Sequence, residues 1–439
     1  MQMIHVDFSK PVRQIKVMNA VNNGPIRARS DQTSGNFMDY KAIRIPYARN
    51  HDAAFCASYG GEHTVDISAV FPNFDADPDD PASYDFVLTD NYVRTTLEAG
   101  TETFYRLGSK IEHNIKKYGT LPPKDPHKWC VICEHIIRHY TEGWADGMKN
   151  AITYWEIWNE PDLDPDDSTN KRCWGGTKAQ FFDLFAMAAR HLKYCFPNLK
   201  IGGPASAGNE EWAREFLAEM SVRRIHLDFF SWHIYMDEPI KLYDKAVRMR
   251  EMLDRYGYTE TESICNEWNY IKNWDTKFEY SVTQIHGVKN APFAARTMSL
   301  CQDGPVDMLM YYDARPSTFN GLFSLYNYEL LPAYYVYGMW ADLRELGTEV
   351  TAEGMGEGVT VTAAKDENGR GGLMIAAYCD DDSVTSPVEV EICIDGLGVT
   401  GAKCRMVDSV KRGEETELAA AQTYRFALEP NTVCYLALN

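Results

Sequence analysis

Basic residues are scarce in this sequence relative to acidic ones, and no apolar run is long enough to cross a bilayer. The 44 lysines and arginines stand against 63 aspartates and glutamates, so the formal net charge is −19. This charge argues against partners that are polyanions, such as nucleic acid or an anionic membrane surface. It favours a neutral substrate, although a local basic pocket can override the field of the whole molecule.

The sequence also lacks the paired cysteines of a small disulfide-stabilised domain. Its 11 cysteines are scattered, and its one C-x-x-C pair, Cys130 and Cys133, lies in a helical pattern with no second pair. We interpret the cysteines as small buried hydrophobic residues, and unpaired thiols predict a reducing compartment. Residues 1–8 have neither the basic nor the apolar region of a secretory signal, so we expect a cytoplasmic protein.

No segment has a glycine-rich phosphate turn or the spacing of a metal site. The acidic, proline-rich segment 74–81 lacks the regular ligand spacing and the terminal glutamate of a calcium loop. We interpret this segment as a solvated loop. The sequence therefore predicts neither a cofactor nor a metal ion.

The composition is that of a soluble globular protein, with 45% hydrophobic and 24% charged residues. A chain of 439 residues is too long for one ordinary core, but it suits a large barrel plus a smaller domain. Aromatic residues reach 13%. They fill a core well, and some can also line a sugar site, because the apolar faces of sugars stack on flat rings.

Between residues 150 and 346, short β-prone runs alternate with segments of helical periodicity. The predicted strands, including three upstream candidates, are 15–21, 42–47, 101–107, 152–158, 199–201, 227–235, 263–268 and 306–312. The predicted helices are 129–140, 179–196, 211–220, 241–256, 291–301 and 332–346. Eight strands alternating with helices predict an α/β protein with a (β/α)8 TIM barrel. The rival, a doubly wound open sheet, would need the glycine-rich turn that is missing here.

After residue 346 the pattern changes to short alternating strands separated by Gly, Asp and Asn turns. The predicted strands are 358–364, 372–379, 388–394, 403–407, 423–428 and 432–438. This pattern is typical of a C-terminal antiparallel β-sandwich domain. We expect a barrel over 11–346 and a β-sandwich over 347–439. The N-terminal strand, 1–10, should join the sandwich, because the barrel cannot use a ninth strand.

Two stretches, 155–161 and 264–269, each end a β-prone run with a glutamate among aromatic and amide residues. These glutamates are Glu160 and Glu267. In a barrel of this kind the active site lies at the C-terminal ends of the strands, so both carboxyl groups should reach one rim. Two carboxyl groups across a small gap are what hydrolysis of a glycosidic bond requires.

Five predicted strands deliver polar and aromatic side chains to the same rim, and this convergence argues for one site. The candidate substrate-binding residues are Arg44, His51, Asp52, Trp158, Asn159, His233, Tyr235, Trp268, Tyr312, Asp313 and Arg315. Glu156 lies two residues before Trp158, so it should point into the barrel. Because an unpaired buried carboxylate is costly, we expect it to meet a cation or several donors, with Arg44 as the first candidate. We expect a structural role for it.

The sequence resembles clan A glycoside hydrolases, in which the acid/base glutamate follows strand four in an Asn-Glu-Pro motif and the nucleophile ends strand seven. It is most similar to family 39, typified by β-xylosidases and α-L-iduronidase. The segments that carry the resemblance are 21–25, 155–163, 202–205, 231–235 and 266–269. The sequence departs from the usual family pattern at Asn266, at Trp232 and at 44–47. These departures leave the chemistry intact and bear on the sugar specificity.

The resemblance implies that Glu160 is the general acid/base and Glu267 the nucleophile of a retaining exo-glycosidase. The substrate would be a small neutral oligosaccharide, plausibly a β-xyloside. An α-L-arabinoside, β-glucoside or β-galactoside is an alternative. An α-L-iduronide is less favoured, because we identify no clustered basic pocket for a uronate. Family resemblance also suggests a homo-oligomer. A non-catalytic carbohydrate-binding barrel is the rival class, and the presence of both glutamates argues against it.

We expect each neighbour of the two glutamates to have a stated role. Tyr235 and Arg44 should keep Glu267 ionised, and the charge of Glu267 should raise the pKa of Glu160 above that of a free glutamate. His233 should orient Glu160 or contact the leaving group. Asn159 should bind the 2-hydroxyl of the sugar. Two tryptophans are candidate stacking platforms, Trp158 and Trp268.

Overall fold

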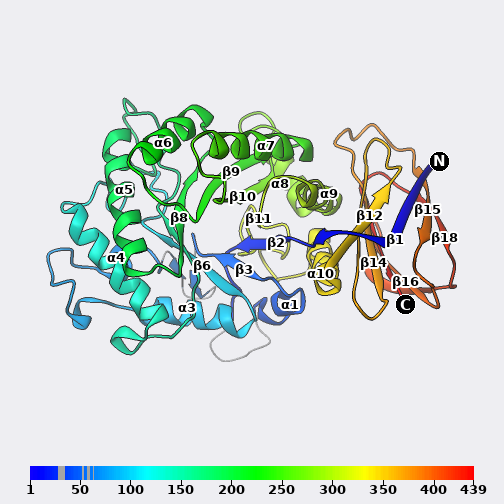
Figure 1. Ribbon diagram of the computed structural model, residues 1–439, viewed down its shortest axis with the longest axis horizontal. Helices are drawn as coiled ribbons and strands as arrows, with labels where there is room; N and C mark the ends of the chain where they lie inside the picture. The colour runs from blue at the N-terminus through cyan, green and yellow to red at the C-terminus, as the bar shows by residue number, and fades with distance from the viewer. Residues whose placement is uncertain (28–34, 52–53, 57–59, 63) are drawn as a thin grey trace.

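The structure is a computed structural model that describes residues 1–439 except 28–34, 52–53, 57–59 and 63. Eight parallel strands form a closed barrel, in the order β10-β11-β2-β3-β6-β7-β8-β9 (Figure 1). The strands are β2 (Val17–Asn22), β3 (Tyr47–Arg49), β6 (Glu102–Leu107), β7 (Tyr154–Ile157), β8 (Lys200–Ser206), β9 (Phe229–Met236), β10 (Glu262–Tyr270) and β11 (Met308–Tyr311). The predicted (β/α)8 barrel is confirmed.

Helices surround the barrel. The six predicted helices are all present, whereas those at 37–42, 67–70, 87–98 and 278–286 were not predicted. They are α1 (Phe37–Ala42), α2 (Ile67–Val70), α3 (Val87–Glu98), α4 (Pro126–Thr141), α5 (Lys178–Cys195), α6 (Glu210–Val222), α7 (Pro239–Arg255), α8 (Phe278–His286), α9 (Asn290–Asp303) and α10 (Pro332–Leu346). A small hairpin is formed by β4 (Ala54–Cys56) and β5 (Gly60–Glu62). Among the helices described here, none combines the length and apolarity needed to span a membrane.

The interior of the barrel is layered. An apolar layer contains Phe104, Tyr154, Phe229 and Ile264. Two residues further along the same strands come Arg106, Glu156, Ser231 and Asn266, all of them buried. Because side chains alternate across a strand, this spacing of two keeps both layers inside the barrel. A polar floor thus lies directly beneath the rim where the strands end.

The second body is one nine-stranded sheet in the order β17-β16-β19-β14-β13-β12-β1-β15-β18. Its strands are β1 (Gln2–Gln14), β12 (Thr348–Glu353), β13 (Val359–Lys365), β14 (Gly371–Ala377), β15 (Val388–Asp395), β16 (Ala402–Val407), β17 (Arg412–Leu418), β18 (Thr423–Leu428) and β19 (Thr432–Leu438). Strand β1 pairs in parallel with β15, and the other described pairings in this sheet are antiparallel. Ile4, Ile375 and Ile392 share one core, so the sheet closes over its own apolar face.

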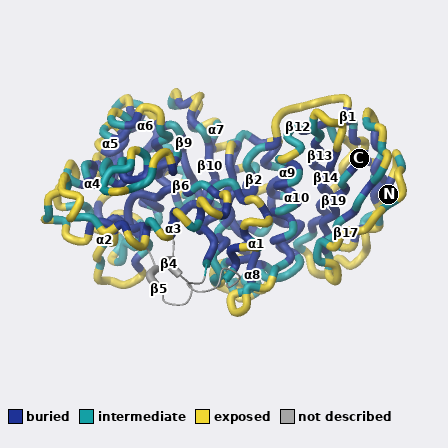
Figure 2. Tube along the Cα trace, turned by 90° about the horizontal axis from the view of Figure 1, so that it is seen from below, coloured by how far each residue is buried: buried dark blue, intermediate teal, exposed yellow. Residues whose placement is uncertain are grey.

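The sheet packs against the barrel through α9 and α10, and Figure 2 shows buried chain running from these helices into β13, β14 and β19. Met374 and Val433 of the sheet belong to the same hydrophobic cluster as the barrel helices. Thr362 Oγ1 donates to Ser299 Oγ of α9 at 2.8 Å. The two bodies therefore share a continuous buried interface.

One barrel strand lies elsewhere than predicted. The sequence predicted a strand at 42–47, whereas α1 ends at Ala42 and β3 begins only at Tyr47. Arg44 lies between these two elements with a φ of +50°, in the left-handed region. The strand residues therefore come five positions later in the chain, which changes which arginine faces the interior.

Candidate active site

A cavity of about 630 Å3 lies at the rim where the barrel strands end, a size that suits a small ligand. Glu160 follows β7, His233 and Tyr235 lie on β9, and Glu267 lies on β10. All four side chains line the cavity. The fold thus brings together two glutamates that are far apart in the sequence.

Glu160 stands on a turn with unusual backbone geometry. Its φ is +46° and that of Trp158 is +76°, a region that side-chain-bearing residues seldom adopt. The Glu160 N–H donates to Ala205 O of β8 at 2.9 Å, and the Trp158 N–H donates to Leu107 O of β6 at 2.7 Å. Both neighbouring strands therefore fix the turn that carries Glu160.

His233 stands between the two carboxyl groups. Its Nδ1 hydrogen-bonds Glu160 Oε1 at 2.8 Å and lies 3.5 Å from Glu267 Oε2. One oxygen of each carboxyl and one ring nitrogen of His233 all lie within 4.8 Å of one another. This separation is close to the roughly 5–5.5 Å of retaining glycosidases and well below the roughly 6.5–9.5 Å of inverting ones.

Burial sets the protonation of this group. It raises the pKa of Glu160 to about 8, with the nearby charge of Asp162 as the next cause. It lowers the pKa of His233 to about 4, so the ring is neutral. Burial also raises the pKa of Glu267, while Arg49 opposes that rise. The elevated pKa of Glu160 was expected, but burial and Asp162 are its leading causes, in place of Glu267.

Arg49 is fully buried and joins three functional side chains from below. Its Nε donates to Glu156 Oε2 at 2.6 Å and its Nη1 donates to Glu267 Oε1 at 2.7 Å. Its Nη2 donates to Asn159 Oδ1 at 2.6 Å. Burial alone would lower the pKa of Arg49, but the two carboxylates raise it, so the guanidinium stays charged.

The assignment of this cation to Arg44 is wrong. Arg44 is about half exposed, and its Nη2 forms an ion pair with Asp342 of α10, away from the cavity. Arg49 takes the place expected for it, because β3 begins at Tyr47 and both Tyr47 and Arg49 face the barrel interior. Glu156 otherwise meets the expected surroundings.

Glu156 is completely buried in the polar floor. In addition to the bond from Arg49, it accepts a hydrogen bond from Ser231 Oγ at 2.6 Å and another from Asn266 Nδ2. A cation and two neutral donors therefore compensate its charge. These contacts place Glu156 under the site, where it holds Arg49 in position.

Tyr235 meets the nucleophile candidate as expected. Its O–H donates to Glu267 Oε2 at 2.8 Å. Its ring meets the rings of Trp274 and Tyr312 edge-on, at centroid distances of 5.2 and 6.4 Å. The carboxylate of Glu267 thus has a donor on each oxygen.

The two tryptophans proposed as stacking platforms are not in the cavity wall. Trp158 is 1% exposed, and its Nε1 donates to Cys173 O at 2.8 Å. Trp268 is fully buried, and its ring packs against Tyr311 at 5.3 Å. Both rings support the strand ends from outside.

The aromatic wall is formed by Tyr312, which was a predicted candidate, and by two loop residues that the sequence analysis did not single out, Trp274 and Phe319. Trp274 follows β10, is 53% exposed and lines the cavity with Tyr312 and Phe319, which follow β11. The Phe319 ring lies 6.2 Å from Trp274 and 5.9 Å from Tyr312. The signal available in the sequence was an aromatic residue a few positions after the Glu267 strand.

The remaining predicted residues divide between the wall and its surroundings. His51 lines the cavity and accepts a hydrogen bond from Arg106 Nε at 3.3 Å on its Nδ1. Asp313 is fully buried and lies 3.8 Å from Arg315 Nε, in a network beside the wall. Asp52 falls outside the described residues.

Two clusters in the described chain offer metal-ligating atoms. One is Glu160, His233 and Glu267, and the other is Glu134, His191 and Cys195 on α4 and α5. In the first, Arg49 already donates to Glu267 and burial favours protonated Glu160. This charge arrangement fits proton transfer better than a divalent cation.

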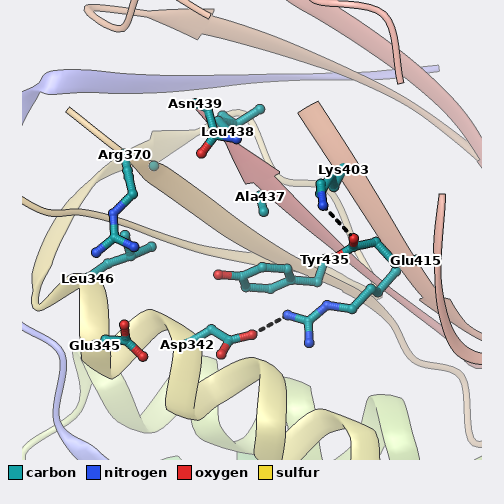
Figure 3. Close-up of a pocket in the computed structure, with 12 residues that line it drawn as sticks. Asp342, Glu345, Leu346, Arg370, Lys403, Glu415, Tyr435, Ala437, Leu438 and Asn439 are labelled. Carbon is teal, nitrogen blue, oxygen red and sulfur yellow. Dashed lines mark hydrogen bonds and ion pairs between the residues drawn. The ribbon is translucent and has the colours of Figure 1, made fainter. Parts of the chain in front are cut away.

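A second hollow, between α10 and the sheet, is lined by charged residues that pair with one another (Figure 3). Lys403 Nζ donates to Glu415 Oε1 at 2.7 Å, and Arg405 pairs with Asp342. The Arg405 guanidinium also lies 4.6 Å from the Tyr435 ring centroid. Its charges compensate one another, and it has no counterpart to the paired carboxyl groups.

Comparison with known proteins agrees with this geometry. The family model described as "Glycosyl hydrolases family 39" matches residues 15–410. A β-xylosidase of Geobacillus stearothermophilus is 24% identical over 299 residues, which cover 61% of this chain and 57% of that protein. A β-xylosidase of Caldicellulosiruptor saccharolyticus is 30% identical over 181 residues, 39% of this chain and 34% of that protein. The matched regions thus span 57% of the first relative and 34% of the second.

Among solved structures, a glucosidase from Croceicoccus marinus superposes with a TM-score of 0.83 at 22% identity. The superposition covers 100% of this chain and 99% of that one. At this identity the likeness concerns the fold, and it extends over both the barrel and the second sheet.

Proposed function

The chain belongs to the glycosyl hydrolases of family 39, and from this premise we propose that it is a retaining exo-glycosidase. Its substrate would be a short oligosaccharide with a neutral terminal sugar, with β-xylosides as the first candidates. The observation that carries the proposal is the placing of Glu160 and Glu267 around His233, with an oxygen of each carboxyl within 4.8 Å. The limited cavity volume supports action on chain ends.

In the first step Glu267 attacks the anomeric carbon. The bond from that carbon to the leaving oxygen breaks, and Glu160 gives its proton to this oxygen. Glu160 suits this role because its pKa of about 8 keeps it protonated at neutral pH. Arg49 and Tyr235 donate to Glu267 and hold it ionised before the attack.

In the second step water cleaves the glycosyl ester on Glu267. Glu160, now ionised, takes a proton from the water while the oxygen of the water bonds to the anomeric carbon. The ester bond breaks at the same time and regenerates the Glu267 carboxylate. Esterification has removed a negative charge from the cavity, which favours the ionised form of Glu160. The amide oxygen of Asn159 is fixed by Arg49, and its Nδ2 donates to Cys173 Sγ at 4.0 Å; its second N–H is the proposed donor to the 2-hydroxyl.

Three related glycosidase specificities are alternatives to the β-xylosidase. β-Glucosidase is the main alternative, because the Croceicoccus marinus structure that shares the whole fold is a glucosidase. α-L-Arabinosidase and β-galactosidase are further alternatives with the same chemistry. A non-catalytic carbohydrate-binding barrel is disfavoured, because binding alone would not need a protonated Glu160 opposite Glu267.

Two coarser proposals concern the whole protein. We propose a reducing, cytoplasmic location, supported by the free thiols of ten of the 11 cysteines. We also propose a homo-oligomer, for which light scattering after size-exclusion chromatography is the direct measurement.

The test is a panel of chromogenic glycosides, assayed with wild type and two variants. Glu267→Ala should lose turnover on every substrate. The activity of Glu160→Ala should survive best on substrates with activated aryl leaving groups, and added azide should restore activity to this variant. The kcat/KM of wild type should fall as pH rises through about 8, because Glu160 then loses the proton it must donate. Glu260→Ala, an exposed glutamate, serves as control. Wild-type turnover by Glu267→Ala would contradict the nucleophile assignment.

A further inference from the structure

One cation in the cavity wall, Lys245, has no carboxylate partner within ion-pair distance in the described part of the chain. Lys245 on α7 is 6% exposed and lines the cavity together with Ala207, Gly208 and Ile234. Its Nζ donates to the carbonyl oxygen of His233 at 2.9 Å and lies 5.6 Å from the Trp232 ring centroid. Among the described residues, no carboxylate lies within ion-pair distance of this ammonium.

An ammonium group carries three N–H donors, and here one carbonyl accepts from it. Burying a cation without an opposite charge is unfavourable, and burial accordingly lowers the pKa of Lys245. Arg172, the other strongly basic residue in the wall, differs because its Nε donates to Asp164 Oδ2 at 3.2 Å and its Nη2 donates to Asp164 Oδ1 at 2.7 Å. The charges of Glu210 and Asp162 partly oppose the effect of burial on the pKa of Lys245, but neither carboxylate lies within ion-pair distance, so among the described wall residues Lys245 is the cation without a direct carboxylate partner.

The backbone beside Lys245 leaves its ammonium accessible. Gly208 has a φ of +120°, a conformation that favours glycine. A Cβ atom at this position would lie 2.9 Å from Lys245 Nζ and 3.6 Å from His233 O. The missing side chain thus leaves space against the Nζ, within the part of the wall formed by the loop after β8.

The position of Lys245 relates it to the leaving group. His233, whose carbonyl binds Lys245, holds the proton donor Glu160 through its ring. Gly208 lies in the loop after β8. Strand β8 is the neighbour of β7, the strand that Glu160 follows. The aromatic wall lies on the other side, after β10 and β11. Because Glu160 protonates the leaving oxygen, Lys245 lies on the leaving-group side.

We propose that Lys245 binds an acidic group, a carboxylate or a phosphate, on the leaving-group part of the substrate. The inference rests on the proposed glycosidase function and adds a substrate class to it: a neutral terminal sugar linked to an acidic residue. A compact ammonium suits either anion, because it acts as a point charge. The overall charge of −19 does not oppose this, since the effect is local to the cavity.

The test compares aryl glycosides of the sugar that wild type cleaves best. Each aryl ring carries a carboxylate, a phosphate or a neutral carboxamide, in the ortho, meta or para position. We expect wild type to prefer one acidic series over the carboxamide at least tenfold in kcat/KM. Lys245→Met should lower this acid-to-neutral ratio at least tenfold, mainly through KM. The preferred acidic series identifies the anion.

Lys241→Met is the matched control. Lys241 is exposed and lies one turn earlier on α7, and the substitution removes the same charge as Lys245→Met. Its acid-to-neutral ratio should equal that of wild type. A ratio near one for wild type in both acidic series, or an unchanged ratio in a folded Lys245→Met, would overturn the inference while neutral glycosides are still cleaved. If wild type cleaves no glycoside, the proposed function fails and the inference fails with it.

A second measurement needs wild type alone, in case Lys245→Met does not fold. The freed leaving groups, hydroxybenzoate, hydroxyphenyl phosphate and hydroxybenzamide, are titrated as inhibitors. Hydroxybenzoate or hydroxyphenyl phosphate should inhibit at least tenfold more strongly than hydroxybenzamide. Equal inhibition constants for all three compounds would also overturn the inference.

Discussion

A single guanidinium organises the floor of the cavity. Arg49 connects Glu156 on β7, Asn159 in the turn after β7 and Glu267 on β10. Two of these are buried carboxylates that need its charge, and the third is an amide whose orientation it sets. Removing Arg49 would leave uncompensated negative charge in the barrel interior.

Arg49→Met should therefore reduce both stability and activity. Breaking a buried ion pair by removing one partner costs about 3–5 kcal/mol of unfolding free energy. The loss of a donor to Glu267 should also lower kcat by about 100-fold. Urea unfolding and steady-state kinetics measure the two effects.

Arg44→Met is the matched control for this prediction. Arg44 pairs with Asp342 at an exposed site, and such pairs contribute no more than about 1 kcal/mol. Similar losses in the two variants would show that the buried network is not what sets Arg49 apart.

Residue-level prediction from the sequence succeeded where a motif fixes a side chain relative to a strand end. Glu160, Glu267, His233 and Tyr235 all follow from such motifs and meet in one cavity. It failed for Arg49, because two arginines lie within six residues and the strand start decides which one points inward. The space beside the Lys245 ammonium depends on Gly208 in the loop after β8, which no local pattern around Lys245 reveals.

At the scale of elements, apolar periodicity located the helices that bury a continuous stripe. Helix α10 has the predicted bounds, and α5 spans Lys178–Cys195 where 179–196 was predicted. Helix α3 was missed because several of its apolar residues are exposed and its buried face includes Thr89 and Thr96. Strand β17 was missed because it is a charged edge strand with no buried residue.

The capping box of α5 gives a prediction at this scale. Thr177 Oγ1 accepts from the Gln180 N–H at 3.2 Å, and Gln180 Oε1 accepts from the Thr177 N–H at 2.9 Å. Thr177→Ala should lower the unfolding free energy by about 1 kcal/mol, because the Gln180 N–H loses the hydroxyl that accepts its hydrogen bond. Denaturant unfolding checks the value.

Thr177→Ser keeps the hydroxyl and should stay within a few tenths of a kcal/mol of wild type. Both variants should keep their kcat, since the cap lies outside the cavity. If alanine and serine unfold at the same denaturant concentration, the hydroxyl does not contribute as described.

At the scale of the whole molecule, a loop of the second sheet braces the active-site side of the barrel. Asp380, after β14, accepts from the Tyr270 O–H at 2.6 Å at the end of β10. Lys289, which is 2% exposed, donates to Asp382 Oδ1 at 2.6 Å and to Asp380 O at 2.9 Å. Trp274 lies in the barrel loop between these contacts.

Lys289→Met should weaken the contact between the loop after β14 and the barrel, because it removes the hydrogen bonds to Asp380 and Asp382. We expect a loss of about 1–3 kcal/mol in unfolding free energy, because hydrogen bonds to a charged group are lost at a buried site. KM should rise as the Trp274 loop loses support, with a smaller effect on kcat. Thermal unfolding and kinetics on the best substrate measure both.

Lys277→Met is the control, because Lys277 is exposed in the same loop region and has no comparable bonds to the sheet. It should resemble wild type in both measurements. An unchanged KM in Lys289→Met would mean that the sheet does not support the aromatic wall.

The central place of β1 in the second sheet has a consequence for biosynthesis. Its neighbours, β12 and β15, lie more than 300 residues later in the chain. During synthesis, β1 leaves the ribosome long before β12 and β15 are made, so it cannot pair with them until almost the entire polypeptide has emerged. Residues of the barrel can begin to associate earlier, so the sheet that flanks them is the last part of the nascent protein to assemble.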